Sequence, residues 1–72
     1  MKIVDKFRVG SRNVAVCDGI GASNVSPGTK VSINDEIFVI VDREVSNSFT
    51  NQTVVFWELD NMPPLGECVI LI

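Results

Sequence analysis

The sequence predicts an all-β fold, a single small and mostly antiparallel β-barrel of about six strands over residues 1–72. Val and Ile dominate the apolar residues, whereas Leu and Ala are scarce. β-branched side chains pack well on a pleated sheet and lose χ1 freedom in a helix. Gly, Pro, Asn and Ser recur at short intervals, as the turns of an antiparallel β protein require. With 46% apolar residues the chain is too hydrophobic to stay disordered.

The first half of the chain predicts two strands and two turns. Residues 3–9 form the first strand, residues 10–13 a turn, and residues 13–20 a second strand with loose alternation. Gly19 and Gly21 then indicate a bulge or a sharp bend. Residues 26–29 have the sequence SPGT, in which Pro presets φ and Gly tolerates the positive φ of a tight turn.

The middle of the chain predicts a strand covered on both faces. Residues 30–33 form a short strand, and Asn34 and Asp35 form a bend because both accept left-handed geometry. Residues 37–41 show no polar alternation, which is typical of a strand without a solvent face. A closed barrel provides this, since one face fills the interior and the other meets a loop, an arm or a partner. Residues 42–44 are expected to end this strand in solvent.

The last third predicts two more strands. Residues 46–52 form a polar loop, residues 53–57 a strand, and residues 58–61 at most one helical turn. The prolines within residues 62–66 exclude regular structure and form a turn. Residues 68–72 are wholly apolar and form the closing strand.

Composition restricts the partners and cofactors. Six basic residues are scattered in a chain of net charge −3, which disfavours strong nucleic-acid binding. Histidine is absent, and Cys17 and Cys68 alone make no zinc site, so no cofactor or metal is predicted. Both cysteines lie in apolar runs and are expected to be buried free thiols, with a disulfide between them as the alternative. Without a signal-peptide pattern or a membrane-spanning run, we expect a cytoplasmic protein with no membrane partner.

Three segments resemble a known family. Residues 12–19 (RNVAVCDG), 32–40 (SINDEIFVI) and 66–71 (GECVIL) resemble the translation-factor β-barrel, the second domain of translational GTPases such as elongation factor Tu. The resemblance implies a barrel with a binding role, because that family supports the acceptor end of tRNA and packs on a GTPase neighbour. Asn13 and Asn34 stand where the family often has Gly. No G-x-x-x-x-G-K-S/T motif is present, so the chain carries no GTPase engine.

The first functional hypothesis is a non-enzymatic binding module with a protein partner, RNA-associated proteins included. Phe56 and Trp57 are adjacent on a predicted strand and must point to opposite faces, so one faces outward or lies under the turn at residues 62–64. Exposed aromatic residues supply large contact area at low entropic cost. The predicted contact residues are Phe49, Trp57 and Met62.

The second hypothesis is a ligand-binding barrel. Arg8 and Arg12 form an R-x-x-x-R element, and Asn24 and Ser26 belong to a D/N-x-S-x-x-G-like turn in which Thr29 replaces the last Gly. Together they resemble the PilZ domain, which binds cyclic di-GMP. Even spacing on or near one strand would place both arginines on one face, where guanidinium groups grip phosphate. The alternative is a pair of solvated arginines beside a turn.

The third hypothesis, an enzyme, has no supporting constellation. The carboxylates at residues 35–36 and 42–44 lie at strand ends, where charges are solvated rather than held in a shared pocket. Without histidine, no Ser-His or Cys-His arrangement can form. No catalytic residue is therefore predicted.

Overall fold

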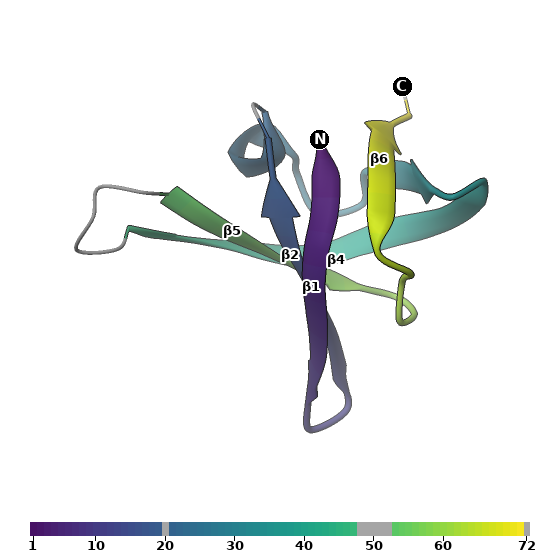
Figure 1. The fold of residues 1–72 in the computed structure, drawn as a ribbon. Helices are drawn as coiled ribbons and strands as arrows, with labels where there is room; N and C mark the ends of the chain where they lie inside the picture. The colour runs from purple at the N-terminus through teal and green to yellow at the C-terminus, as the bar shows by residue number, and fades with distance from the viewer. Residues whose placement is uncertain (20, 48–52, 72) are drawn as a thin grey trace.

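The computed structural model describes residues 1–19, 21–47 and 53–71, which form a closed antiparallel barrel of six strands. Neighbouring strands follow the order β1-β2-β5-β4-β3-β6, and β6 returns to β1 (Figure 1). The predicted all-β barrel is thus confirmed. The strands are β1 (Lys2–Val9), β2 (Arg12–Asp18), β3 (Lys30–Ile33), β4 (Glu36–Asn47), β5 (Thr53–Leu59) and β6 (Gly66–Ile70), with one 3-10 helix, η1 (Ala22–Asn24).

Two hairpins, β1–β2 and β3–β4, have two-residue turns, and each turn contains a residue with positive φ. Gly10 has φ 61° between the paired residues Val9 and Arg12, as the first position of a type II′ hairpin turn requires. Asn34 and Asp35 have φ values of 49° and 68° between β3 and β4, the geometry of a type I′ turn. The predicted bend at Asn34 and Asp35 is confirmed, and it is a hairpin turn.

Asn34 also connects this turn to the start of β6. Its Nδ2 donates a hydrogen bond of 3.1 Å to the carbonyl oxygen of Leu65. Gly66 follows with φ 142°, and a Cβ built there would lie 2.6 Å from Asn34 Oδ1. The Asn34 side chain therefore packs against Gly66, where a larger residue would clash with it. A glycine at position 34 would have no side chain to donate the hydrogen bond to Leu65.

The expectation that residues 37–41 are covered on both faces is wrong. Phe38 and Ile40 are buried, but Ile37 is 63% exposed and Val41 is 48% exposed. β4 also continues through the acidic segment to Asn47, twelve residues in all. It pairs with β3 up to Val39 and with β5 from Ile40 onward, so one long strand serves two sides of the barrel. Alternation fills the interior with one face of β4 and leaves the other face in solvent.

The helical turn expected at residues 58–61 is also wrong. Glu58 and Leu59 belong to β5, and the one helical turn among the described residues is η1. η1 lies beside β5 in the fold because Trp57 Nε1 donates a hydrogen bond of 2.9 Å to the carbonyl oxygen of Ala22. The conformation of η1 thus depends on a hydrogen bond to Trp57, which is 35 positions away in the sequence. A local sequence pattern cannot reveal such a contact.

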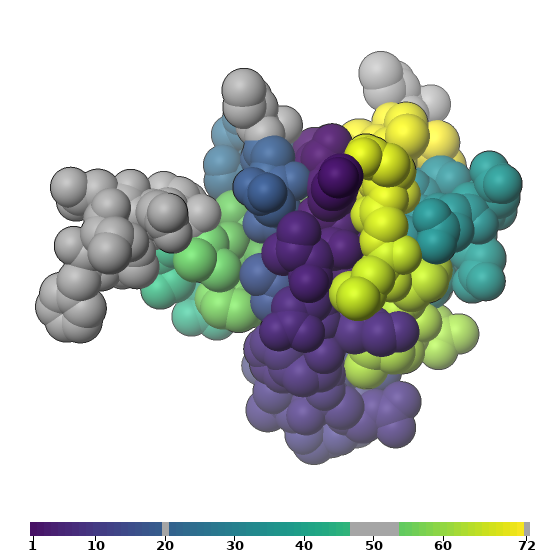
Figure 2. All heavy atoms as spheres, viewed as in Figure 1, coloured from purple at the N-terminus to yellow at the C-terminus, as the bar shows by residue number. Residues whose placement is uncertain are grey.

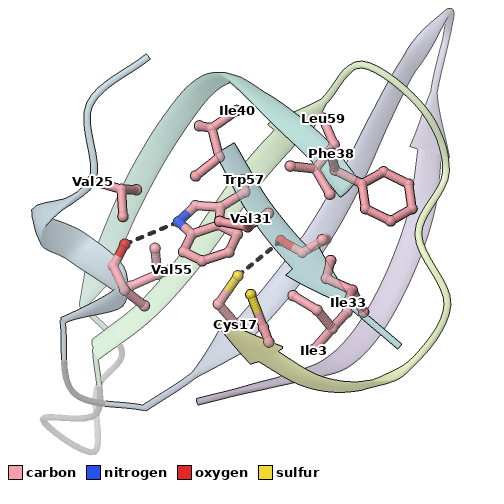
Figure 3. Packing of buried hydrophobic residues seen from close by; sticks show 13 residues of the cluster. Ile3, Cys17, Val25, Val31, Ile33, Phe38, Ile40, Val55, Trp57 and Leu59 are labelled. Carbon is pink, nitrogen blue, oxygen red and sulfur yellow. Dashed lines mark hydrogen bonds between the residues drawn. The ribbon is translucent and has the colours of Figure 1, made fainter. Parts of the chain in front are cut away.

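Trp57 occupies the centre of a fully apolar core (Figure 3). Its side chain is 0% exposed, and no polar or charged side chain is buried among the described residues. Cys17 and Cys68 are buried free thiols, as expected. Burial, with a smaller contribution from Cys68, raises the pKa of the Cys17 thiol to about 12. The rest of the cluster is aliphatic or aromatic and comprises Ile3, Ala15, Ala22, Val25, Val31, Ile33, Phe38, Ile40, Val55 and Leu59.

Replacement of the buried indole tests this core. The substitution Trp57→Phe removes the donor to Ala22 and leaves space behind a smaller ring. We expect the free energy of unfolding to fall by about 2–4 kcal/mol in urea titrations. Phe56→Leu, at the adjacent half-buried position, should cost below about 1 kcal/mol. Equal losses in the two variants would contradict the assignment of Trp57 to the interior.

The thiol burial predicts a loss of stability in alkali. Folding raises the pKa of Cys17 from 9.0 to about 12, so between these values the unfolded chain releases a proton that the folded chain keeps. The stability that the buried Cys17 thiol contributes to the folded state is complete below pH 9.0. It falls by about 1.4 kcal/mol per pH unit between pH 9.0 and about 12. Burial raises the pKa of Cys68 as well, so this thiol also makes the folded state less stable as the pH rises in alkali. Urea titrations across this range should show the decline, with a shallower slope in Cys17→Ala; a flat profile would contradict it.

Candidate partner-binding surface

The outer face of four neighbouring strands, β1, β2, β5 and β4, gathers side chains that the interior excludes. Directly opposed residues of antiparallel strands share a face. Phe7 pairs with Val14, Val14 with Glu58, and Glu58 with Asp42, so these four form one row across the strands. A second row contains Asp5, Val16, Phe56 and Glu44.

This face is hollowed into a cavity of about 460 Å³ that opens to solvent. Its apolar lining comes from Phe7, Val9, Val14 and Phe56. The rings of Phe7 and Phe56 meet edge to face, with centroids 6.2 Å apart and planes at 71°. Phe7 is 40% exposed and Val9 is 51% exposed, so part of this apolar lining is available to a partner.

Charged residues line the other side of the cavity. Arg12 Nε donates a hydrogen bond to Glu58 Oε1, and the two side chains form an ion pair. The hydrogen bond and the charge of Glu58 raise the pKa of Arg12, which stays charged. Asp42, Glu44 and Arg43 also line the cavity, and Asp42 Oδ1 accepts a bond of 2.8 Å from the backbone N–H of Arg43. Asp42 and Glu44 stand opposite Glu58 and Phe56 on the outer face, whereas Arg43 stands opposite Trp57, whose side chain points inward. Once Arg12 and Glu58 are paired, the rim is therefore acidic.

Arg8 and Arg12 do not share a face, which corrects the sequence prediction. The turn at Gly10 and Ser11 changes strands between them, and Arg12 stands opposite Val9. Arg12 therefore lies on the face of Val9, and Arg8 lies on the other face, where it stands opposite Asn13. Even spacing places two residues on one face only within a single strand. Arg8 Nη2 approaches Asn13 Oδ1 at 3.4 Å.

Asn24 and Ser26 lie far from both arginines. Asn24 is the last residue of η1, Ser26 follows two positions later, and both are exposed. In Figure 1 the β1–β2 turn lies at the bottom and η1 at the top. β2 spans roughly 20 Å between Arg12 and Asp18, and η1 follows its far end. The structure does not assemble the four residues of the proposed nucleotide site.

The three predicted contact residues have three different outcomes. Trp57 is buried in the core, so its assignment as a partner contact is wrong. The β-strand register selects Phe56, its neighbour, for the outer face. Met62 is half-buried after β5, and its backbone N–H bonds to Asn61 Oδ1 at 2.9 Å. Phe49 lies outside the described residues.

Sequence reasoning missed Phe7, Val9, Asp42 and Glu44 as parts of one surface. Phe7 and Val9 alternate with charged residues in β1, and this period-2 pattern signals a strand with one apolar face. The pattern does not reveal that the face points outward. That depends on the irregularity in the β1–β2 register between Ile3 and Asp5, which shifts the alternation of β1.

Two properties of the described residues concern metal-binding groups and nucleophiles. No group of three or more His, Cys, Asp or Glu residues within them could hold a metal ion. The buried thiols are Cys17 and Cys68, and burial raises their pKa values, so both stay protonated near neutral pH. A thiol rather than a thiolate is a poor nucleophile.

No family model matches the chain, and no curated protein or solved structure matches it. Within the described parts of the chain, no helix has the length and apolar character needed to cross a membrane.

The separation of the arginines from η1 predicts no response to cyclic di-GMP. Arg8 and Arg12 lie on opposite faces of the hairpin, and Asn24 follows the other end of β2. These residues therefore cannot contact one nucleotide together. We expect an unchanged melting temperature when cyclic di-GMP is added in excess. A rise in melting temperature that Arg8→Ala or Arg12→Ala abolishes would show that these residues do form a nucleotide site.

Proposed function

We propose that this barrel is a non-enzymatic module that binds a protein partner through the hollow on the outer face of β1, β2, β5 and β4. The observation that carries the proposal is an apolar cavity with an acidic rim outside a barrel that is already filled inside. Trp57 and its neighbours occupy the interior of the barrel. The outer cavity falls within the volume range of binding pockets.

The lining of the cavity favours an apolar side chain with a cation beside it. Phe7 and Phe56 supply aromatic area of the kind that dominates protein–protein contacts. Asp42 and Glu44 are exposed carboxylates, which attract Lys or Arg and repel phosphate. A basic and apolar segment of a protein therefore fits this surface better than a nucleic-acid backbone does.

The resemblance to the translation-factor β-barrel supports a binding role. That family holds partners with a small β-barrel, and the present chain forms a closed antiparallel barrel of six strands and lacks the GTPase motif. A partner associated with RNA is compatible with this role. A cytoplasmic location stays a prediction. The non-enzymatic assignment is supported by the exposure of Asp35 and Glu36 at a turn and by the inert state of the thiols.

A phage-displayed library of short random linear peptides tests the proposal. We expect enriched peptides to combine an aromatic or aliphatic residue with Lys or Arg. Glu44→Lys should weaken the selected peptides by about ten-fold, because it places a cation at the acidic rim. Glu36→Lys makes the same charge change at an exposed position at the start of the same strand and should leave affinity unchanged.

Two results would overturn the proposal. One is the absence of any enriched sequence. The other is enrichment of peptides that bind the Glu44→Lys and Glu36→Lys variants as tightly as the unmodified protein, since these peptides would be held elsewhere.

A further inference from the structure

β1 presents a free strand edge beyond its first residues. It pairs with β2 from Lys2 to Val9, but with β6 only at Lys2 and Ile3. Among the described residues, no strand pairs with residues 5–9 on the side away from β2. Figure 2 shows the β1–β2 hairpin, in purple and blue, extending below the end of β6, in yellow. The edge is therefore exposed as well as unpaired.

The backbone groups on this edge follow from the hairpin turn. Val9 and Arg12 flank a two-residue turn and form the closing hydrogen-bonded pair, and such pairs alternate along an antiparallel ladder. The backbone groups of Lys6 and Arg8 therefore point away from β2. The N–H of Lys6 bonds to Asp5 Oδ1 at 2.8 Å. The N–H of Arg8 and both carbonyl oxygens have no backbone partner among the described residues.

The side chains of the edge divide into a basic and an apolar face. Lys6 and Arg8 lie on one face, and neither has a carboxylate partner in the described part of the chain. Phe7 and Val9 lie on the other face, where they line the outer cavity, and Asp5 lies on that face at the start of the segment. An incoming strand would therefore meet two cations on one face and two apolar side chains on the other.

We propose that residues 5–9 of β1 bind an extended segment of the protein partner as an added antiparallel strand. Its acidic side chains stand opposite Lys6 and Arg8, and its apolar side chains stand opposite Phe7 and Val9. Main-chain hydrogen bonds supply affinity and the alternating side chains supply specificity. The inference rests on the proposed function, because it describes how the protein partner of the adjoining cavity is held.

A second copy of this chain fits the edge poorly. Two β1 edges related by a two-fold axis pair residues of the same face. An axis at Phe7 places Lys6 opposite Arg8 of the second copy, and an axis at Lys6 or Arg8 places that cation opposite itself. Like charges directly opposed destabilise a strand pair, and basic residues on an edge prevent self-pairing. The charge pattern therefore selects an acidic segment of another protein.

The test uses capped peptides of alternating Glu and Val with isotope-labelled protein. We expect the Glu–Val peptide to shift the NMR amide signals of residues 5–9 and to slow hydrogen exchange at Arg8. A matched Lys–Val peptide should bind about ten-fold more weakly, because each of its cations meets Lys6 or Arg8. The double variant Lys6→Glu, Arg8→Glu should reverse this preference, and its melting temperature checks that it folds.

N-methylation distinguishes strand addition from simple charge attraction in the unmodified protein. The amides opposite Lys6 and Arg8 belong to the Glu residues, so their methylation should abolish binding, whereas methylation of the Val amides should be tolerated. Equal binding of the two methylated peptides, or no binding of the Glu–Val peptide, overturns the inference. It is also overturned if sedimentation shows self-association that the double variant abolishes, because the edge then belongs to a second copy. The library result with Glu44→Lys is independent of these outcomes.

Discussion

The barrel depends on the burial of one indole. Trp57 lies at the centre of the core, fully enclosed, and its single donor is satisfied by the carbonyl oxygen of Ala22. A chain of 72 residues has few large side chains with which to fill a closed sheet, so the position of this ring sets the inward face of β5. A slip of one residue would move Phe56 inward and leave the indole in water, so the register is strongly specified.

That register determines the outer surface as strictly as the inner one. Because Trp57 points inward, Phe56 must point outward, and pairing carries the same choice to Val16 in β2 and Glu44 in β4. The outer cavity is thus a consequence of the same alternation that packs the core. β1 has eight residues and pairs with β6 only at Lys2 and Ile3, so the rest of β1 has the free edge.

Local patterns predicted most elements of this fold, and their failures have specific causes. The turn at Asn34 is predictable from the sequence because Asn and Asp are residue types that tolerate the left-handed backbone conformation. The apolar run after it indicates a strand covered on both faces, although only alternate residues enter the core. Even spacing indicates a shared face for Arg8 and Arg12 only within one strand, and here the turn at Gly10 and Ser11 moves Arg12 to the next strand. The helix η1 depends on Trp57, a distant residue, and so has no local signal.

By itself, the sequence determined that this chain forms a small antiparallel barrel, since stiff β-branched side chains and turn residues act within a few positions of one another. It also determined that both cysteines lie in apolar surroundings, because each belongs to an apolar run. Only the tertiary structure decided which face of each strand is inside, and with it whether Phe56 or Trp57 meets solvent. Facing is decided by pairing between distant strands and by one shift in register in β1, and neither is a property of any short segment.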